Sequence, residues 1–226
     1  MRKSVLSLRV LIAVFLVMLP IAAFAHQPNY VANRKEIVDT EPTISKAYYG
    51  ELTGQYAIYE VAADSDFELY LNILSPYNLH ASKDFSVAVK DSKGTVLGIL
   101  NDPPIEWTRW YEEYAGDWYW QGPELRRHLP SGRYRIIVQN PIRVGKYVLA
   151  IGEGEAFPPS EMPRMLKELY LVKTRFFGDP WYSIYRGVVG RYLIYSSITI
   201  VILVIFSVWI LVRLIRKGVR SRQRAA

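Results

Sequence analysis

An uncharged stretch near the C-terminal end limits this chain more than any other feature. The 21 residues from Tyr192 to Val212 contain no charged side chain and are rich in Ile, Val and Leu. At 1.5 Å per residue, a helix of this length just crosses a hydrocarbon core of about 30 Å. The sequence therefore predicts one transmembrane helix over 192–212.

The flanks of this stretch predict its orientation. Aromatic rings near its two ends are of the kind that favours the membrane interface, and the residues that follow are basic, which marks the cytoplasmic side. The predicted anchoring residues are Tyr192, Tyr195, Trp209, Arg213, Arg216 and Lys217. We expect residues 213–226 to form a basic cytoplasmic tail.

The N-terminal residues predict a secretory signal peptide over 1–25. Arg2 and Lys3 precede an apolar run, and Ala23-Phe24-Ala25 offers small residues at a cleavage site before His26. Such a pattern is typical of a cleaved signal, and an uncleaved anchor is the alternative. Together with the predicted span, it places the middle of the chain outside the cytoplasmic membrane of a prokaryote. The chain has no cysteine, so neither disulfides nor lipidation at a cysteine can hold that part.

The net charge of +7 comes from the two ends. Nine basic residues lie in residues 1–10 and 213–226, which leaves 28 − 9 = 19 basic against 21 acidic residues, or −2, for residues 26–212. A basic nucleic-acid-binding face is therefore not expected.

The middle of the chain has the period-two pattern of β-strands. Phe67, Leu69, Leu71 and Ile73 alternate with mostly polar residues, as in a half-buried antiparallel strand. Similar short runs, separated by turn residues, recur between Ser45 and Glu153. They predict a mainly β chain with an antiparallel β-sandwich or jelly-roll domain over 45–156, after an N-terminal extension over 26–44.

Two segments of this domain carry a family resemblance. The run 129–138 followed by 145–151 resembles the closing hairpin of the bacterial pre-peptidase C-terminal family of jelly-roll domains, and Gly50-Glu51-Leu52 with 56–61 resembles its opening strands. The resemblance implies an accessory module on a secreted or surface protein. It brings no catalytic residues with it.

The juxtamembrane segment 157–191 predicts an amphipathic helix of about 17 residues. Its apolar residues recur at helical spacing, with Ser160 as the expected N-cap and Gly178-Asp179-Pro180 as the stop. They are Met162, Met165, Leu166, Leu169, Val172 and Phe176. This stripe packs either on the domain itself or on lipid. Trp181, Tyr182 and Tyr185 then predict an interfacial aromatic belt before the span.

Residues 101–124 are the strongest candidate for a binding site. They hold four of the six tryptophans beside six carboxylates. Aromatic faces stack on sugar rings, and carboxylates bind hydroxyl groups or a hard cation such as calcium, so a glycan or a protein partner is the expected ligand. The alternative is that these rings fill the sandwich core. The predicted ligand-binding residues are Trp107, Trp110, Tyr111, Glu112, Glu113, Asp117, Trp118 and Trp120.

His26 is the candidate metal ligand. If the signal is cleaved before it, its α-amine and ring nitrogen together can chelate copper. Lytic polysaccharide monooxygenases and periplasmic copper-resistance proteins are similar in beginning at such a histidine. Further ligands would come from His80, His128 or a carboxylate, and the alternative is that His26 merely follows a cleavage site. No cofactor other than copper is predicted.

The standard motifs of hydrolases, metalloproteases and phosphate-binding loops are missing from the sequence. We therefore expect a non-enzymatic, single-pass envelope protein whose β domain binds a partner or glycan. The alternatives are a copper-binding protein that uses His26 and an accessory subunit that docks on a larger membrane complex through Met165, Leu169 and the span.

Overall fold

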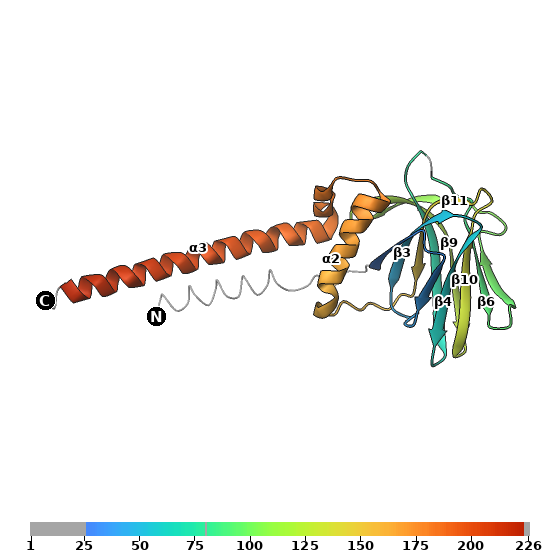
Figure 1. Ribbon diagram of the computed structural model, residues 1–226, viewed down its shortest axis with the longest axis horizontal. Coiled ribbons are helices and arrows are strands. Elements are labelled where there is room, and N and C mark those ends of the chain that lie inside the picture. The colour runs from blue at the N-terminus through green and yellow to red at the C-terminus, as the bar shows by residue number, and fades with distance from the viewer. Residues whose placement is uncertain (1–25, 80, 224–226) are drawn as a thin grey trace. The chain divides into compact units, whose positions relative to one another are not determined.

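The computed structural model describes residues 26–79 and 81–223 (Figure 1), so the predicted signal peptide over 1–25 and His80 lie outside the described residues. The described residues form two units: residues up to Gly187 make a β domain, and the long C-terminal helix belongs to the other unit.

The β domain is a sandwich of two sheets. The six-stranded sheet has the order β1-β3-β11-β5-β9-β8, and the five-stranded sheet has the order β2-β4-β10-β6-β7. The pairs β1/β3 and β2/β4 are parallel, and the remaining pairs are antiparallel. The strands are β1 (Gln27–Ala32), β2 (Glu36–Asp39), β3 (Lys46–Thr53), β4 (Tyr56–Ala63), β5 (Phe67–Pro76), β6 (Ser86–Asp91), β7 (Val96–Leu100), β8 (Thr108–Glu112), β9 (Asp117–Leu129), β10 (Gly132–Gln139) and β11 (Val144–Ile151).

Alternation along the strands builds the core between the sheets. Phe67, Leu69, Leu71 and Ile73 of β5 are all buried there, which confirms the face predicted from the sequence. They meet side chains such as Ile136 of β10 from the opposite sheet. Burying this apolar surface is what holds the two sheets together.

Residues 26–44 differ from the expectation of an extension ahead of the domain. They form β1 and β2, which are edge strands of the two different sheets. Val31 and Ile37 enter the core between the sheets. The sandwich thus begins at Gln27 rather than at residue 45, because these short strands pair with β3 and β4 soon after them in the chain.

A helical segment covers the outer face of the six-stranded sheet (Figure 1). It runs through η1 (Pro159–Glu161), α2 (Met162–Leu171) and the π-helical turn η2 (Val172–Phe176). Val172 and Phe176 pack with Tyr49, Tyr119 and Val148 of the sheet. The C-terminal half of the apolar stripe is therefore buried on its own domain, which is one of the two arrangements that the sequence left open, whereas Met162 at its start is exposed.

The expected cap at Ser160 was wrong. Ser160 lies inside the 3-10 turn η1, and the N-cap residue of α2 is Glu161, which makes no side-chain capping hydrogen bond. Pro163 near the start of α2 suits the first helical turn, where backbone N–H groups have no partner within the helix.

The second unit contains most of α3 (Gly187–Gln223), whose stretch from Gly187 to Arg213 includes 18 consecutive residues with a mean hydropathy of 2.5. This stretch is long and apolar enough to cross a membrane, and it contains the predicted span 192–212. The predicted anchors Tyr195, Trp209, Arg213 and Arg216 are exposed on it, Tyr192 is half-buried, and Lys217 belongs to the same helix.

Candidate functional site: an aromatic patch on the β8–β9 hairpin

The predicted binding segment folds as a hairpin whose register divides its side chains between two faces. Trp110 lies opposite Tyr119, and Tyr111 lies opposite Trp118. Because successive side chains of a strand point to opposite faces, Trp110 and Tyr111 cannot belong to the same surface. The eight predicted residues therefore do not form one site.

One face of the hairpin carries a cluster that we name the aromatic patch, defined as Tyr77, Lys83, Arg109, Tyr111, Trp118 and Trp120. The ring centroids of Tyr111 and Trp118 are 4.8 Å apart, and those of Tyr77 and Trp120 are also 4.8 Å apart. Tyr77 is held in place by a backbone hydrogen bond, in which its N–H donates to the carbonyl of Trp118 at 3.0 Å.

Two cations lie on the rings of the aromatic patch. The guanidinium carbon of Arg109 is 3.8 Å from the ring centroid of Trp118 and 4.7 Å from that of Tyr77. The ammonium of Lys83 is 4.0 Å from the centroid of Trp120. Such cation–π contacts contribute about 0.5–1 kcal/mol each at exposed sites, so they order a surface that would otherwise be mobile.

The rings of the aromatic patch are open to solvent at their edges. Tyr77 is 41% exposed, Tyr111 39% and Trp118 42%, while Trp120 is partly buried against the core. Trp118 and Trp120 do share a face, but that face lies at the rim of the core, so Trp118 does not fill the interior. The guanidinium of Arg109 lies over the ring of Trp118, and the rings of Tyr77 and Tyr111 contact that ring at tilted angles of 51° and 46°.

Glu112 and Asp117 lie on the opposite face of the hairpin and are engaged within the domain. Glu112 accepts backbone N–H bonds from Tyr114 at 2.8 Å and Ala115 at 2.7 Å. Burial raises the pKa of the Glu112 carboxyl above its ordinary value of 4.5, although those two hydrogen bonds act in the opposite direction. Asp117 is buried against the ammonium of Lys173 in η2. Neither carboxylate shares a surface with the aromatic patch.

Of the three remaining predicted residues, only Trp110 shares a face with Glu112 and Asp117, and none of the three belongs to the aromatic patch. Trp107 is buried in the core between the sheets, beneath Gly122, so it cannot form part of a ligand-contacting surface. Trp110 is about one third exposed and contacts Tyr119 on the face toward η2. Glu113 is exposed in the turn between the two strands.

Sequence reasoning missed Tyr77, Lys83 and Arg109 of the aromatic patch, and also Lys173. Tyr77 and Lys83 come from the segment after β5, and no local pattern marks them. Arg109 has a detectable signal, because a strand spanning 108–112 puts it on the same face as Tyr111. Lys173 also has a detectable signal in the sequence, because it follows Val172 within an otherwise apolar helical stripe.

His26 has a partner within the domain. Its Nδ1 lies 2.5 Å from Oγ of Ser45, and burial lowers the pKa of its imidazole although nearby Glu153 acts to raise it. Among the described residues, no group of three or more His, Asp or Glu side chains is arranged to hold a metal ion. Copper binding by His26 stays a prediction.

Met165 and Leu169 of α2 were expected to dock on a larger membrane complex, but their side chains are at least partly buried in the domain. Leu169 is buried and Met165 is half-buried, so neither offers a free apolar side chain to a membrane complex. Lys167 and Tyr170 are the exposed members of this part of α2.

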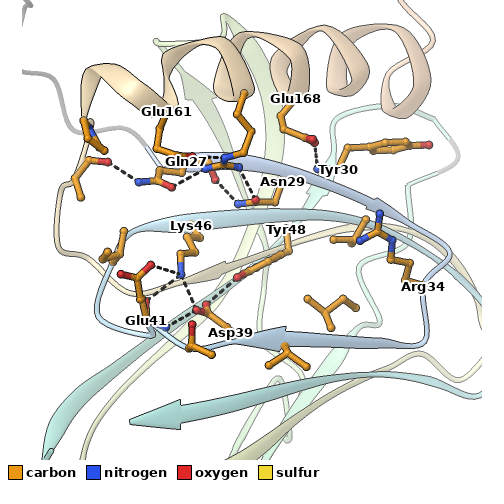
Figure 2. A pocket seen from close by; sticks show the side chains of 18 of the residues that line it. Gln27, Asn29, Tyr30, Arg34, Asp39, Glu41, Lys46, Tyr48, Glu161 and Glu168 are labelled. Atoms are coloured by element: carbon orange, nitrogen blue, oxygen red, sulfur yellow. Dashed lines mark hydrogen bonds and ion pairs between the residues drawn. The ribbon is translucent and has the colours of Figure 1, made fainter. Parts of the chain in front are cut away.

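A polar cavity of about 580 Å³ lies between the edge strands β1 and β2 and helix α2 (Figure 2). Arg164 donates to Oε1 of Gln27 and Oδ1 of Asn29, both at 3.0 Å, and Glu168 accepts the backbone N–H of Tyr30 at 2.8 Å. These bonds join α2 to the open edge of β1. They satisfy a strand edge that would otherwise be free to pair with another chain.

Charges on the other wall of the cavity are also paired. The carboxylate of Asp39 accepts from the ammonium of Lys46 at 2.6 Å and from the hydroxyl of Tyr48 at 2.8 Å. These polar groups bond to one another, so the interactions around the cavity hold β1, β2 and α2 together. The aromatic patch is the better candidate for recognition.

Comparison with known proteins gives a weak structural likeness. The pre-peptidase C-terminal domain of collagenase from Bacillus anthracis is similar over 54% of this chain and 94% of that chain, with a TM-score of 0.32 and 14% sequence identity. A β-glucosidase from Paenibacillus barengoltzii is similar over 56% of this chain and 13% of that chain, with a TM-score of 0.25 and 11% identity. No family model matches the chain, and no curated protein matches it.

The first of these similarities agrees with the weak resemblance to pre-peptidase C-terminal domains found in the sequence. Likenesses at this level say nothing about activity or ligands. The β domain followed by one apolar helix fits the class of single-pass membrane proteins with a β ectodomain.

Proposed function

We propose that this protein is a single-pass protein of a prokaryotic cytoplasmic membrane, with its β domain outside, and that the domain binds a protein partner through the aromatic patch. The single observation that carries the binding role is the solvent-exposed group of Tyr77, Arg109, Tyr111 and Trp118. Tyrosine, tryptophan and arginine are the residues most enriched at the energetically important centres of protein interfaces.

The geometry of the aromatic patch favours a protein over a glycan. A sugar ring stacks on the open face of an aromatic ring, but the guanidinium of Arg109 already lies over the ring of Trp118, 3.8 Å from its centroid. Glu112 and Asp117, which were expected to bind hydroxyl groups, lie on the other side of the hairpin. A partner that contacts ring edges and replaces water around Arg109 suits this surface better.

The topology is tested by protease treatment of spheroplasts. We expect digestion of the β domain and protection of the C-terminal tail, because the basic residues after Val212 favour the cytoplasmic side. A digested tail with an intact β domain would contradict the proposed orientation.

The binding role is tested by purifying the full chain from membranes of its native host in mild detergent. Trp118→Ala and Arg109→Ala are each compared with Tyr56→Ala. Tyr56 is a matched control because it is an exposed aromatic residue on a strand and does not belong to the aromatic patch. We expect one protein that co-purifies stoichiometrically with the wild type and with Tyr56→Ala, and that is lost from both patch variants. Equal retention in all variants would refute this role.

The same variants also separate protein from glycan recognition. If the wild-type chain binds an immobilised glycan and Trp118→Ala abolishes that binding, the ligand of the aromatic patch is a glycan and the protein assignment is wrong. Thermal unfolding of each variant serves as the control for folding.

A further inference from the structure

A second exposed aromatic group lies on η3 (Trp181–Tyr185), the 3-10 turn just before α3. Trp181 is 61% exposed, Tyr182 58% and Tyr185 44%. The centroid of the Trp181 ring lies 6.0 Å from that of Tyr182 and 6.4 Å from that of Tyr185. The three rings therefore form one cluster, which we name the η3 rings.

The η3 turn is internally bonded, and the chain after it lies against the β domain, where Gly187 is close to the backbone of Tyr114 and Ala115. Ser183 is fully buried, and its backbone N–H donates to the carbonyl of Pro180 at 2.9 Å. Arg186 pairs with Asp179 at 2.6 Å. Ser183 is the buried member of the turn, whereas the η3 rings are exposed.

Chain length places the η3 rings beside the predicted span. The apolar stretch Gly187–Arg213 has 27 residues, about 40 Å of helix against a hydrocarbon core of about 30 Å, so its first residues lie among the lipid headgroups. Tyr185 precedes Gly187 by two residues, which is at most about 7 Å of chain. The covalent connection alone therefore brings the η3 rings to the headgroup layer.

We infer that the η3 rings insert into the headgroup region of the phospholipid bilayer and seat the domain on the membrane surface. Tryptophan and tyrosine favour this region because each ring has an apolar body and a polar group that stays hydrated. The Arg186–Asp179 pair neutralises the carboxylate of Asp179, two residues before Trp181 in the chain, which would otherwise repel anionic headgroups. The inference rests on the proposed membrane span and adds a second, peripheral contact to it.

Because the chain has no cysteine of its own, a single introduced cysteine can be labelled at one chosen position. Tyr182→Cys and Tyr185→Cys, each carrying a nitroxide label, are reconstituted as full chains into vesicles of phosphatidylcholine and phosphatidylglycerol. Collision of the label with oxygen, which concentrates in lipid, is compared with collision with a water-soluble nickel chelate. Tyr56→Cys is the aqueous control, because Tyr56 is 47% exposed on β4, and Val204→Cys reports on the middle of the span.

We expect the ratio of oxygen to nickel collisions at 182 and 185 to be several-fold higher than at 56 and lower than at 204. A water-like ratio at 182 and 185, with a lipid-like ratio at 204, would overturn the membrane contact and leave the span intact. Low collision with both reagents at 182 and 185 would also overturn it, because the domain itself or a second copy of the chain would then cover these positions. A water-like ratio at 204 would refute the span and the inference together.

Discussion

The ammonium nitrogen of Lys173 lies 2.7 Å from both carboxylate oxygens of Asp117, and both side chains are buried. The same nitrogen donates to the carbonyl of Ala115 at 2.6 Å. This contact joins η2, beneath the six-stranded sheet, to the start of β9, where the next residue is Trp118 of the aromatic patch. Each charge is tolerated in the interior only because the other is present.

Removing one member of this pair should therefore destabilise the domain strongly. Lys173→Met leaves the Asp117 carboxylate buried without a counter-charge and should lower the free energy of unfolding by about 3–5 kcal/mol. Urea unfolding of the full chain in detergent, followed by tryptophan fluorescence, measures the change. Lys173→Met combined with Asp117→Leu should recover most of the loss, because an apolar pair replaces the charges. If the double variant is no more stable than Lys173→Met, charge burial is not the cause.

Tryptophans of the predicted site should separate into core and surface residues. Trp107→Ala opens a cavity between the sheets and should cost about 3–5 kcal/mol of the free energy of unfolding. Trp118→Ala removes a ring that is 42% exposed and should cost less than about 1 kcal/mol. Thermal unfolding of the two variants side by side provides the measurement. Similar losses in both would mean that Trp118 is a packing residue and would weaken its assignment to a binding surface.

The raised pKa of Glu112 predicts a particular pH dependence of stability. Between the ordinary value of 4.5 and the raised pKa, the folded state binds more protons than the unfolded state, so Glu112 makes stability fall as pH rises through that window. Glu112→Gln removes this titration while keeping one acceptor for the turn. The wild type should thus gain stability relative to Glu112→Gln when the pH is lowered from about 7 to about 4. A difference that does not vary with pH would show that Glu112 titrates normally.

The hydrogen bond from the Tyr30 N–H to Glu168 should protect this amide, at the edge of β1, from hydrogen exchange. Glu168→Ala leaves the N–H of Tyr30 without its acceptor, and a hydrogen bond to a charged group contributes about 1.5–3 kcal/mol. Hydrogen exchange of the Tyr30 amide should therefore become at least about tenfold faster. Lys167→Ala, an exposed change on the same helix, should leave that rate unchanged. Equal exchange in both variants would assign the protection of β1 to its pairing with β3 alone.

The parts of the fold that were predictable are those with a local pattern. β5 follows from the alternation of Phe67 to Ile73, and the uncharged run fixes the apolar part of α3, because both patterns lie within one element. β1 and β2 escaped prediction because β2 has only four residues and both strands pair in parallel with partners that no short-range pattern reveals.

The candidate site was predictable in composition and not in geometry. The high tryptophan content of 101–124 identified the hairpin that carries the aromatic patch. The position of the hairpin's turn decides which of its side chains share a face. That turn is held by Glu112, which accepts hydrogen bonds from the N–H groups of Tyr114 and Ala115. Tyr77 reaches the aromatic patch from the segment that follows β5. The sequence of the hairpin alone therefore could not identify Tyr77 as a member of the aromatic patch.

The order of the strands in the two sheets also governs how the domain can form. β10 and β11 are the last strands in the chain, yet β10 lies between β4 and β6, and β11 lies between β3 and β5. During synthesis, each sheet exists as two separate pieces until its central strand arrives and inserts. Such long-range pairing makes for late, slow and highly cooperative folding. A chain that stops before Gly132 retains every earlier strand and completes neither sheet.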